Sequence, residues 1–143
     1  VLFICHSFQM ACKHFGLAEV NKRKDTSFGV MTTHKVNEGM NDPLFEGLTN
    51  PFYTIDSRDF QVVQPHLKNF KKMGAQIIAL EKIRDHVQYE RAVMGIRFSN
   101  EFVGLQFHPE EVIFNRTKEA SAITCRWGDH VGKSKKYRAL LGL

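Results

Sequence analysis

The chain has 143 residues, which is enough for one compact domain and too few to suggest two. A hydrophobic fraction of 43% is ordinary for a soluble globular protein, and neither a membrane span nor a signal peptide is indicated, so a cytoplasmic protein is expected. The net charge of +5 gathers partly in basic clusters that could attract nucleic acid, but no recognised nucleic-acid motif accompanies them, which favours a solvated basic surface.

The first residues predict a strand, a sharp turn and a helix. Residues 1–4 are uniformly apolar, as in a short buried strand. From His6 to Phe15 the apolar positions follow helical spacing, and Gly16 stands where a left-handed C-terminal cap is expected. Cys5 therefore occupies the corner between the strand and the helix.

The middle of the chain is predicted to consist mainly of strands. Extended segments are expected at residues 17–20 and 27–34. Two further apolar segments, 52–55 and 60–63, flank the polar stretch 56–59, which predicts a hairpin or a bend.

The second half predicts a short helix at 67–73, closed by Gly74. Strands are expected at 75–80, 92–98 and 101–107, the last two forming a hairpin. Residues 113–143 show no consistent period and receive no assignment. We treat 1–143 as a single domain.

The three cysteines are Cys5, Cys12 and Cys125, and they form no even disulfide framework, which favours free thiols. Two of them lie near His6 and His14, but structural zinc usually draws on two well-spaced ligand pairs. The sequence therefore predicts neither a metal site nor a cofactor.

A cysteine at a strand-to-helix corner has surroundings suited to a nucleophile. The turn exposes the side chain at the end of a sheet. The dipole and free N–H groups of the following helix favour the thiolate, and N–H groups after Cys5 can meet a developing oxyanion. A small buried core residue is the alternative interpretation of Cys5.

A base for this thiolate stands about a hundred residues later. His108 and Glu110 follow the apolar strand ending at Phe107. Residues two apart in an extended segment project to the same face, so the Glu110 carboxylate is expected beside the His108 ring. Glu110 would hold one imidazole nitrogen while the other faces the thiol. The alternative is that Pro109 begins a helix whose first turn Glu110 stabilises.

The segments CHSFQ at residues 5–9 and GLQFHPE at residues 104–110 together resemble the class I (triad) glutamine amidotransferases, and the similarity is closest to the glutaminase domain of GMP synthase and its stand-alone relatives. The resemblance extends to about residue 112. It implies an α/β, flavodoxin-like fold with a mostly parallel sheet and an added antiparallel hairpin, and it implies that N-terminal strands of that fold are missing from this chain.

The resemblance also implies an activity. Cys5 would attack the side-chain amide of glutamine, release ammonia and leave a glutamyl thioester for water to hydrolyse. His108 would be the general base and acid, and Glu110 would orient it. The backbone N–H of His6 would be one oxyanion donor, and Gln9 would help to hold the glutamine.

The polar stretch falls where the family places a loop that contacts the amino-acid end of the substrate. There Asp59 would pair with the ammonium group and Ser57 would form a hydrogen bond; a solvated turn is the alternative. Family members usually have glycine two residues before and after the cysteine. This chain has Phe3 and Ser7 instead, which predicts a tightened or displaced elbow.

The expected partners are glutamine, or a related γ-glutamyl amide, and a separate synthetase chain that accepts the ammonia, since no phosphate-binding glycine loop is present. Three alternatives remain open: a γ-glutamyl peptidase or hydrolase on the same fold, a non-catalytic regulatory relative, and a basic nucleic-acid-binding protein that keeps the fold.

Overall fold

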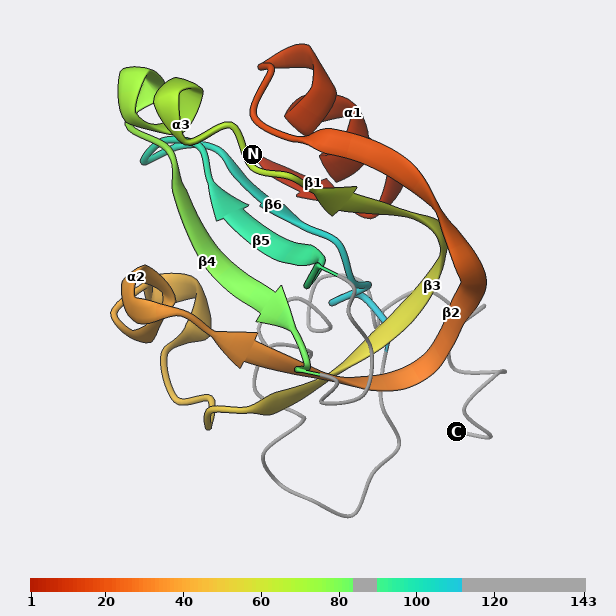
Figure 1. Cartoon of the computed structure of the whole chain (residues 1–143). Coiled ribbons are helices and arrows are strands. Elements are labelled where there is room, and N and C mark those ends of the chain that lie inside the picture. The colour runs from red at the N-terminus through yellow and green to blue at the C-terminus, as the bar shows by residue number, and fades with distance from the viewer. Residues whose placement is uncertain (84–89, 112–143) are drawn as a thin grey trace.

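The computed structural model of the chain describes residues 1–83 and 90–111 (Figure 1). The stretch 113–143, which has no predicted structure, lies outside the described residues. Within them the strands form one curled sheet in the order β1-β6-β5-β4-β2-β3. The strands are β1 (Leu2–Ile4), β2 (Glu19–Lys35), β3 (Phe52–Val63), β4 (Gln76–Glu81), β5 (Val93–Arg97) and β6 (Val103–Leu105). The helices are α1 (His6–His14), α2 (Asn37–Met40), α3 (Leu67–Met73) and the 3-10 helix η1 (Pro43–Phe45).

The direction of pairing follows from the connections along the chain. Strands β4, β5 and β6 follow one another and pair antiparallel, as do β2 and β3. The short turn between β5 and β6 allows only this arrangement. Strands β1 and β6 are far apart in sequence and pair in parallel. An α/β sheet with an antiparallel hairpin was expected, but in residues 1–83 and 90–111 the parallel pairing is the minority.

The predicted bend in the polar stretch is wrong, because β3 continues as a strand through it and pairs with β2 on both sides, with a register shift between the Phe60 and Arg58 pairs. Asp56 and Arg58 point to the buried face, where Arg58 Nε donates to Asp56 Oδ2 at 2.7 Å and Ser27 Oγ donates to the same oxygen at 2.8 Å. Ser57 and Asp59 alternate with them and are exposed. The two buried charges neutralise each other, so the strand can hold them without turning outward.

The short helix predicted before Gly74 is confirmed as α3, and Gly74 has the left-handed conformation, with φ 73°, that lets glycine end a helix. The helix predicted after Cys5 is confirmed as α1. It presents Phe8 and Cys12 to the sheet, and both are fully buried.

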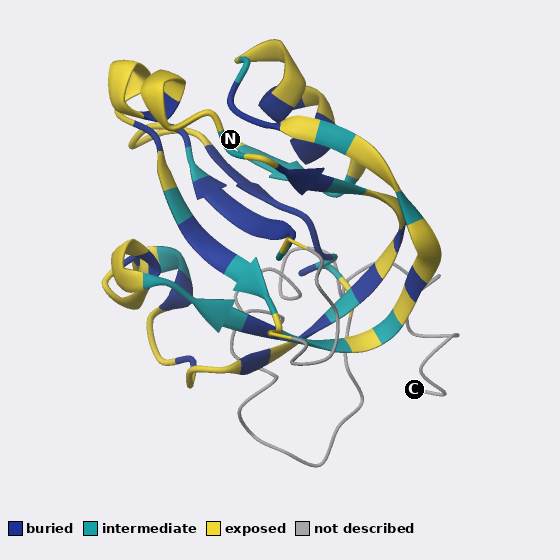
Figure 2. Ribbon diagram, in the orientation of Figure 1, coloured by how far each residue is buried: buried dark blue, intermediate teal, exposed yellow. Residues whose placement is uncertain are grey.

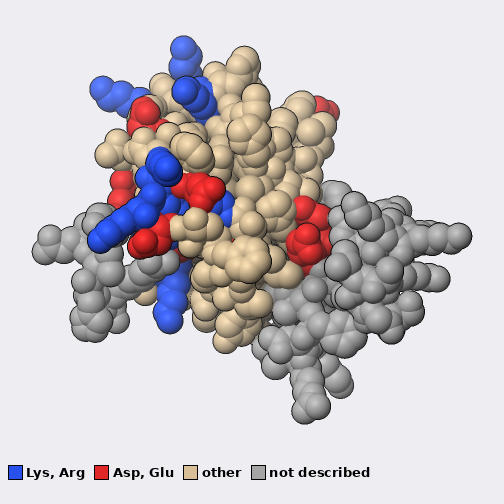
Figure 3. All heavy atoms as spheres, turned by 90° about the vertical axis from the view of Figure 1, so that its right-hand side faces the viewer, with Lys and Arg blue, Asp and Glu red and all other residues tan. Residues whose placement is uncertain are grey.

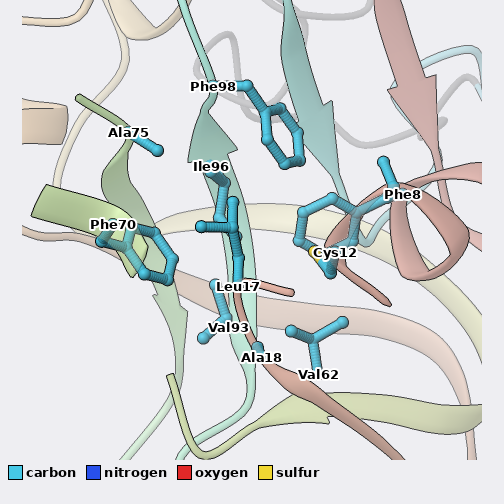
Figure 4. Packing of buried hydrophobic residues seen from close by; sticks show 11 residues of the cluster. Phe8, Cys12, Leu17, Ala18, Val62, Phe70, Ala75, Val93, Ile96 and Phe98 are labelled. Carbon is cyan, nitrogen blue, oxygen red and sulfur yellow. The ribbon is translucent and has the colours of Figure 1, made fainter. Parts of the chain in front are cut away.

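Two apolar clusters hold the sheet and helices together. The first joins Phe8 of α1 and Phe70 of α3 to side chains of the sheet, as Figure 4 shows. The second includes Phe45 of η1 and Phe107, which follows β6. The central strands β5 and β6 are almost wholly buried, whereas the long β2 carries many exposed positions (Figure 2). The end of β6 thus lies in a buried part of the molecule.

Candidate active site

Cys5 stands at a strained corner between β1 and α1. Its φ of 49° and ψ of −104° are unusual for a residue other than glycine. The Cys5 N–H donates to the Leu105 carbonyl at 2.8 Å, which ties the corner to the end of β6. Ser7 Oγ donates to the Ile4 carbonyl at 2.9 Å and accepts from the Ile4 N–H at 2.8 Å. These bonds hold the conformation that exposes a nucleophile at the end of a sheet.

The larger residues in place of the usual glycines are accommodated at this corner. The Phe3 ring packs edge-on against Phe98, with centroids 5.7 Å apart, and is stacked with Phe102 at 6.1 Å. Ser7 contributes the two hydrogen bonds just described. The strand-to-helix elbow therefore forms with Phe3 and Ser7 in these positions.

The parallel pairing of β1 with β6 brings the two distant motifs together. Ile4 is opposite Leu105 in the register, so Cys5 and Gln106 both follow the carboxyl ends of neighbouring parallel strands. Ligands of α/β sheets bind at this edge. The His108 N–H donates to the Ile55 carbonyl at 2.9 Å, which fixes the segment after β6 beside β3.

His108 and Glu110 form a close pair. His108 Nδ1 lies 2.6 Å from Glu110 Oε1, and both side chains are about three-quarters buried. Because Glu110 engages Nδ1, the ring nitrogen left for Cys5 is Nε2. The i and i+2 spacing predicts this juxtaposition.

The surroundings of His108 favour its protonated form. Hydrogen bonds with the Cys5 thiol and then with Glu110 raise the pKa of His108 from 6.5 to about 10, against the opposing effect of burial. Burial raises the pKa of Glu110, but the hydrogen bond with His108 and a backbone hydrogen bond outweigh it, so the net shift is downward. The pair thus favours an imidazolium held between a carboxylate and a sulfur atom.

Two glutamine side chains form a series of hydrogen bonds that begins at the Cys5 sulfur. Gln106 Nε2 donates to Cys5 Sγ at 3.7 Å, and Gln106 Oε1 accepts from Gln9 Nε2 at 3.2 Å. Gln9 Nε2 also lies 3.4 Å from the Phe60 carbonyl. Gln9 is a predicted site residue, whereas Gln106 is not. The sequence does contain a signal for Gln106: its amide stands between the apolar Leu105 and Phe107, and a polar side chain in such a buried position needs hydrogen-bond partners.

The other predicted residues differ in whether they contact Cys5. The Cys5 thiol donates weakly to the Ser57 carbonyl at 3.7 Å, so the backbone of Ser57, and not its hydroxyl, meets the sulfur. Asp59 Oδ1 accepts from Thr26 Oγ1 at 2.6 Å and has no described contact with Cys5. His6 is the first residue of α1, so its N–H has no acceptor within the helix.

Charges of both signs mix on the face that contains β2 and β3. Figure 3 shows Lys and Arg side chains beside Asp and Glu side chains there, and not a field of one sign. In residues 1–83 and 90–111 no group of three or more His, Cys, Asp or Glu side chains is placed to hold a metal ion. No helix in the same ranges is long and apolar enough to cross a membrane.

The family model for glutamine amidotransferase class-I matches residues 1–121. The match covers most of the chain, so the chain belongs to the class-I glutamine amidotransferase family. None of the curated proteins compared with it matches.

Solved structures agree with this fold. A protein from Thermoplasma acidophilum, described as one subunit of a GMP synthase, is 21% identical with a TM-score of 0.60, covering 99% of this chain and 60% of its own. A glutamine amidotransferase from Thermotoga maritima is 20% identical with a TM-score of 0.56, covering 96% and 49%. The glutaminase domain of Trypanosoma brucei CTPS, solved with bound acivicin, is 15% identical with a TM-score of 0.61, covering 93% and 60%. The fold is therefore the α/β, flavodoxin-like fold of glutamine amidotransferases, and this chain spans about half to three-fifths of each of these proteins.

Proposed function

We propose that the protein hydrolyses the side-chain amide of glutamine through a thioester on Cys5 and supplies the ammonia to an acceptor. One observation carries the proposal: Cys5 stands at a strained elbow, His108 Nδ1 lies 2.6 Å from Glu110 Oε1, and interaction with the Cys5 thiol is the main cause of the raised pKa of His108. Family membership supports glutamine amide hydrolysis in general. The residue roles below are part of the proposal.

In the first half-reaction the Cys5 sulfur attacks the amide carbon of glutamine, and the carbonyl oxygen becomes an oxyanion. The N–H of His6, at the start of α1, donates to that oxygen. His108 then gives its Nε2 proton to the leaving nitrogen, the C–N bond breaks, and ammonia departs. A raised pKa suits His108 to this step, because the ring already carries the proton that the leaving group needs.

In the second half-reaction neutral His108 takes a proton from water while the water oxygen attacks the thioester carbon. The C–S bond breaks, glutamate leaves, and the imidazolium beside the Cys5 sulfur is restored. Glu110 holds Nδ1 throughout, so that Nε2 always faces the sulfur. The proton taken from water therefore restores the protonated His108 ring beside the Cys5 sulfur, as at the start of the cycle.

The amino-acid end of glutamine would be held by Gln9, Ser57 and Asp59. Gln9 directs its NH2 group to other protein atoms, which leaves its oxygen as an acceptor for a substrate donor. Asp59 is exposed and negatively charged, as an ammonium-binding residue must be. Ser57 borders the sulfur through its backbone.

The acceptor of the ammonia is proposed to lie on a separate synthetase chain, and the role to be GMP synthase-like. The sequence motifs and the likeness to the Thermoplasma acidophilum protein support this choice. Ammonia transfer would then need the two chains to meet over the edge where β1 and β6 end.

The test is ammonia release by the full-length protein from glutamine and, separately, from γ-glutamyl peptides. We expect glutamine to be the better substrate, and Cys5→Ala to lower the rate by a factor on the order of 10³ or more. Cys12→Ala is the matched control, because the Cys12 thiol is buried in the core and burial raises its pKa far above its ordinary value. Full activity in Cys5→Ala would refute the proposal, and cleavage of γ-glutamyl peptides alone would reassign the substrate.

A further inference from the structure

Gln106 joins the sulfur of Cys5 to the amide of Gln9. Its side chain is 0% exposed, so both polar atoms of its amide must find partners inside the protein. Its backbone N–H donates to the Met94 carbonyl at 2.9 Å, which anchors the residue to β5. The residue that carries the amide is therefore anchored to the buried strand β5.

The Cys5 sulfur determines which group donates and which accepts in the Cys5–Gln106 and Gln106–Gln9 hydrogen bonds. A thiolate can only accept hydrogen bonds, so Gln106 must turn its NH2 group toward Cys5. Its oxygen then faces Gln9, which in turn must present NH2, as the 3.2 Å contact has it. When the thiol ionises it can no longer donate to the Ser57 carbonyl, and the N–H of Gln106 remains as a donor to the charge.

We propose that Gln106 is a positioning residue that stabilises the Cys5 thiolate and fixes the amide orientation of Gln9 toward the substrate. The second part rests on the proposed glutaminase function, whereas the contact with the sulfur stands without it. A purely structural amide, filling the space between β6 and α1, is the competing explanation.

Two substitutions separate the two contacts. Gln106→Glu keeps an acceptor for Gln9 but removes the donor to Cys5 and brings a negative charge near it. Gln106→Met keeps the approximate size and removes both contacts. Gln76→Glu is the matched control, because Gln76 is exposed at the start of β4, two strands away from β6.

The first measurement is the rate of Cys5 alkylation by iodoacetamide as a function of pH in the full-length protein. Fragment spectra of the modified peptides distinguish Cys5 from Cys12 and Cys125. We expect both Gln106 variants to react about tenfold more slowly near neutral pH, with the half-maximal rate reached about one pH unit higher. Gln76→Glu should match the wild type. Wild-type rates and midpoints in both Gln106 variants would overturn the proposal.

The second measurement separates kcat from KM for glutamine. Gln106→Glu should lower kcat while KM stays within about twofold of the wild type, because Gln9 keeps its acceptor. Gln106→Met should also raise KM. Equal KM values in the two variants would refute the role in orienting Gln9.

The third measurement needs no substitution of Gln106, so it tests the contact between Gln106 and the Cys5 sulfur even if the Gln106 variants do not fold. The side-chain amide signal of Gln106 in a ¹⁵N-labelled protein should shift with pH together with the alkylation rate, and it should stop doing so in Cys5→Ala. A signal that ignores pH in the wild type would refute the contact. If the wild type releases no ammonia from glutamine, the proposed function fails, while alkylation and this amide signal still decide the contact with the sulfur.

Discussion

Replacing Glu110 by glutamine removes a charge from His108 while keeping the side-chain size and an acceptor oxygen. Glu110 Oε1 lies 2.6 Å from Nδ1, and its hydrogen bond is the second contribution, after that of Cys5, to the pKa of about 10. A hydrogen bond to a charged group is worth roughly 1.5–3 kcal/mol, against about 1 kcal/mol for a neutral one. The difference corresponds to about one pKa unit, so the pKa of His108 should fall by that amount in Glu110→Gln.

The assay is kcat/KM for ammonia release from glutamine between about pH 6 and pH 10.5. The leaving nitrogen needs the proton of His108, so activity declines as this proton is lost and the alkaline limb follows the pKa of His108. A lower pKa moves that limb to lower pH, by about one unit in Glu110→Gln. Glu111→Gln is the matched control, since Glu111 is exposed and next in sequence. An alkaline limb that stays in place or moves upward in Glu110→Gln would refute the reasoning.

The His108–Glu110 pair also makes the free energy of unfolding depend on pH. The pKa of His108 is raised above 6.5, so its contribution is full below that value and is lost as the pH rises toward 10. The pKa of Glu110 is lowered below 4.5, so its contribution is full above that value and is lost on acidification. The wild type should therefore exceed Glu110→Gln in free energy of unfolding most between pH 4.5 and 6.5. Urea denaturation checks this, and a difference that grows toward pH 10 would contradict it.

Three further substitutions test the packing around the site. In Gly104→Ala the added Cβ would lie 2.4 Å from Phe8 Cδ2, and we expect a loss of about 1–3 kcal/mol in urea denaturation, since the core has no room to shift. Arg58→Leu leaves the Asp56 carboxylate, 1% exposed, without its cation, and it should cost about 3–5 kcal/mol in the same experiment. Ser57→Ala keeps the carbonyl that meets the sulfur and removes an exposed hydroxyl, so the alkylation rate of Cys5 should change by less than about twofold.

Each of these has a control and a contradicting result. In Gly95→Ala the nearest atom to the added Cβ is Ile78 Cγ1 at 3.0 Å, a side-chain atom that can move. Gly95→Ala should therefore lower the free energy of unfolding less than Gly104→Ala does. A larger loss in Gly95→Ala would contradict this account of the packing. Adding Asp56→Asn to Arg58→Leu should recover part of the loss, whereas simple additivity would mean that the two charges do not interact. A fall on the order of tenfold in Ser57→Ala would assign the effect to the hydroxyl.

Local patterns were enough to predict the helices α1 and α3. The apolar spacing after Cys5 and the left-handed glycine after α3 depend on neighbouring residues alone, and the structure has both helices. The bend predicted for the polar stretch in β3 is wrong for the opposite reason. Asp56 and Arg58 look like turn residues until their buried partners, such as Ser27 on the neighbouring strand, are known.

The sequence by itself determined the local arrangement of the candidate site: a thiol at a strand-to-helix corner, and an imidazole with its carboxylate two residues away. These depend on short-range geometry, in which the backbone period sets where side chains point. Only the tertiary structure decided that the corner lies beside the segment that carries the imidazole, because the parallel pairing of β1 with β6 closes a loop of about a hundred residues. It also decided that the buried amide of Gln106 faces the sulfur, since donor and acceptor partners are chosen by contacts between distant strands.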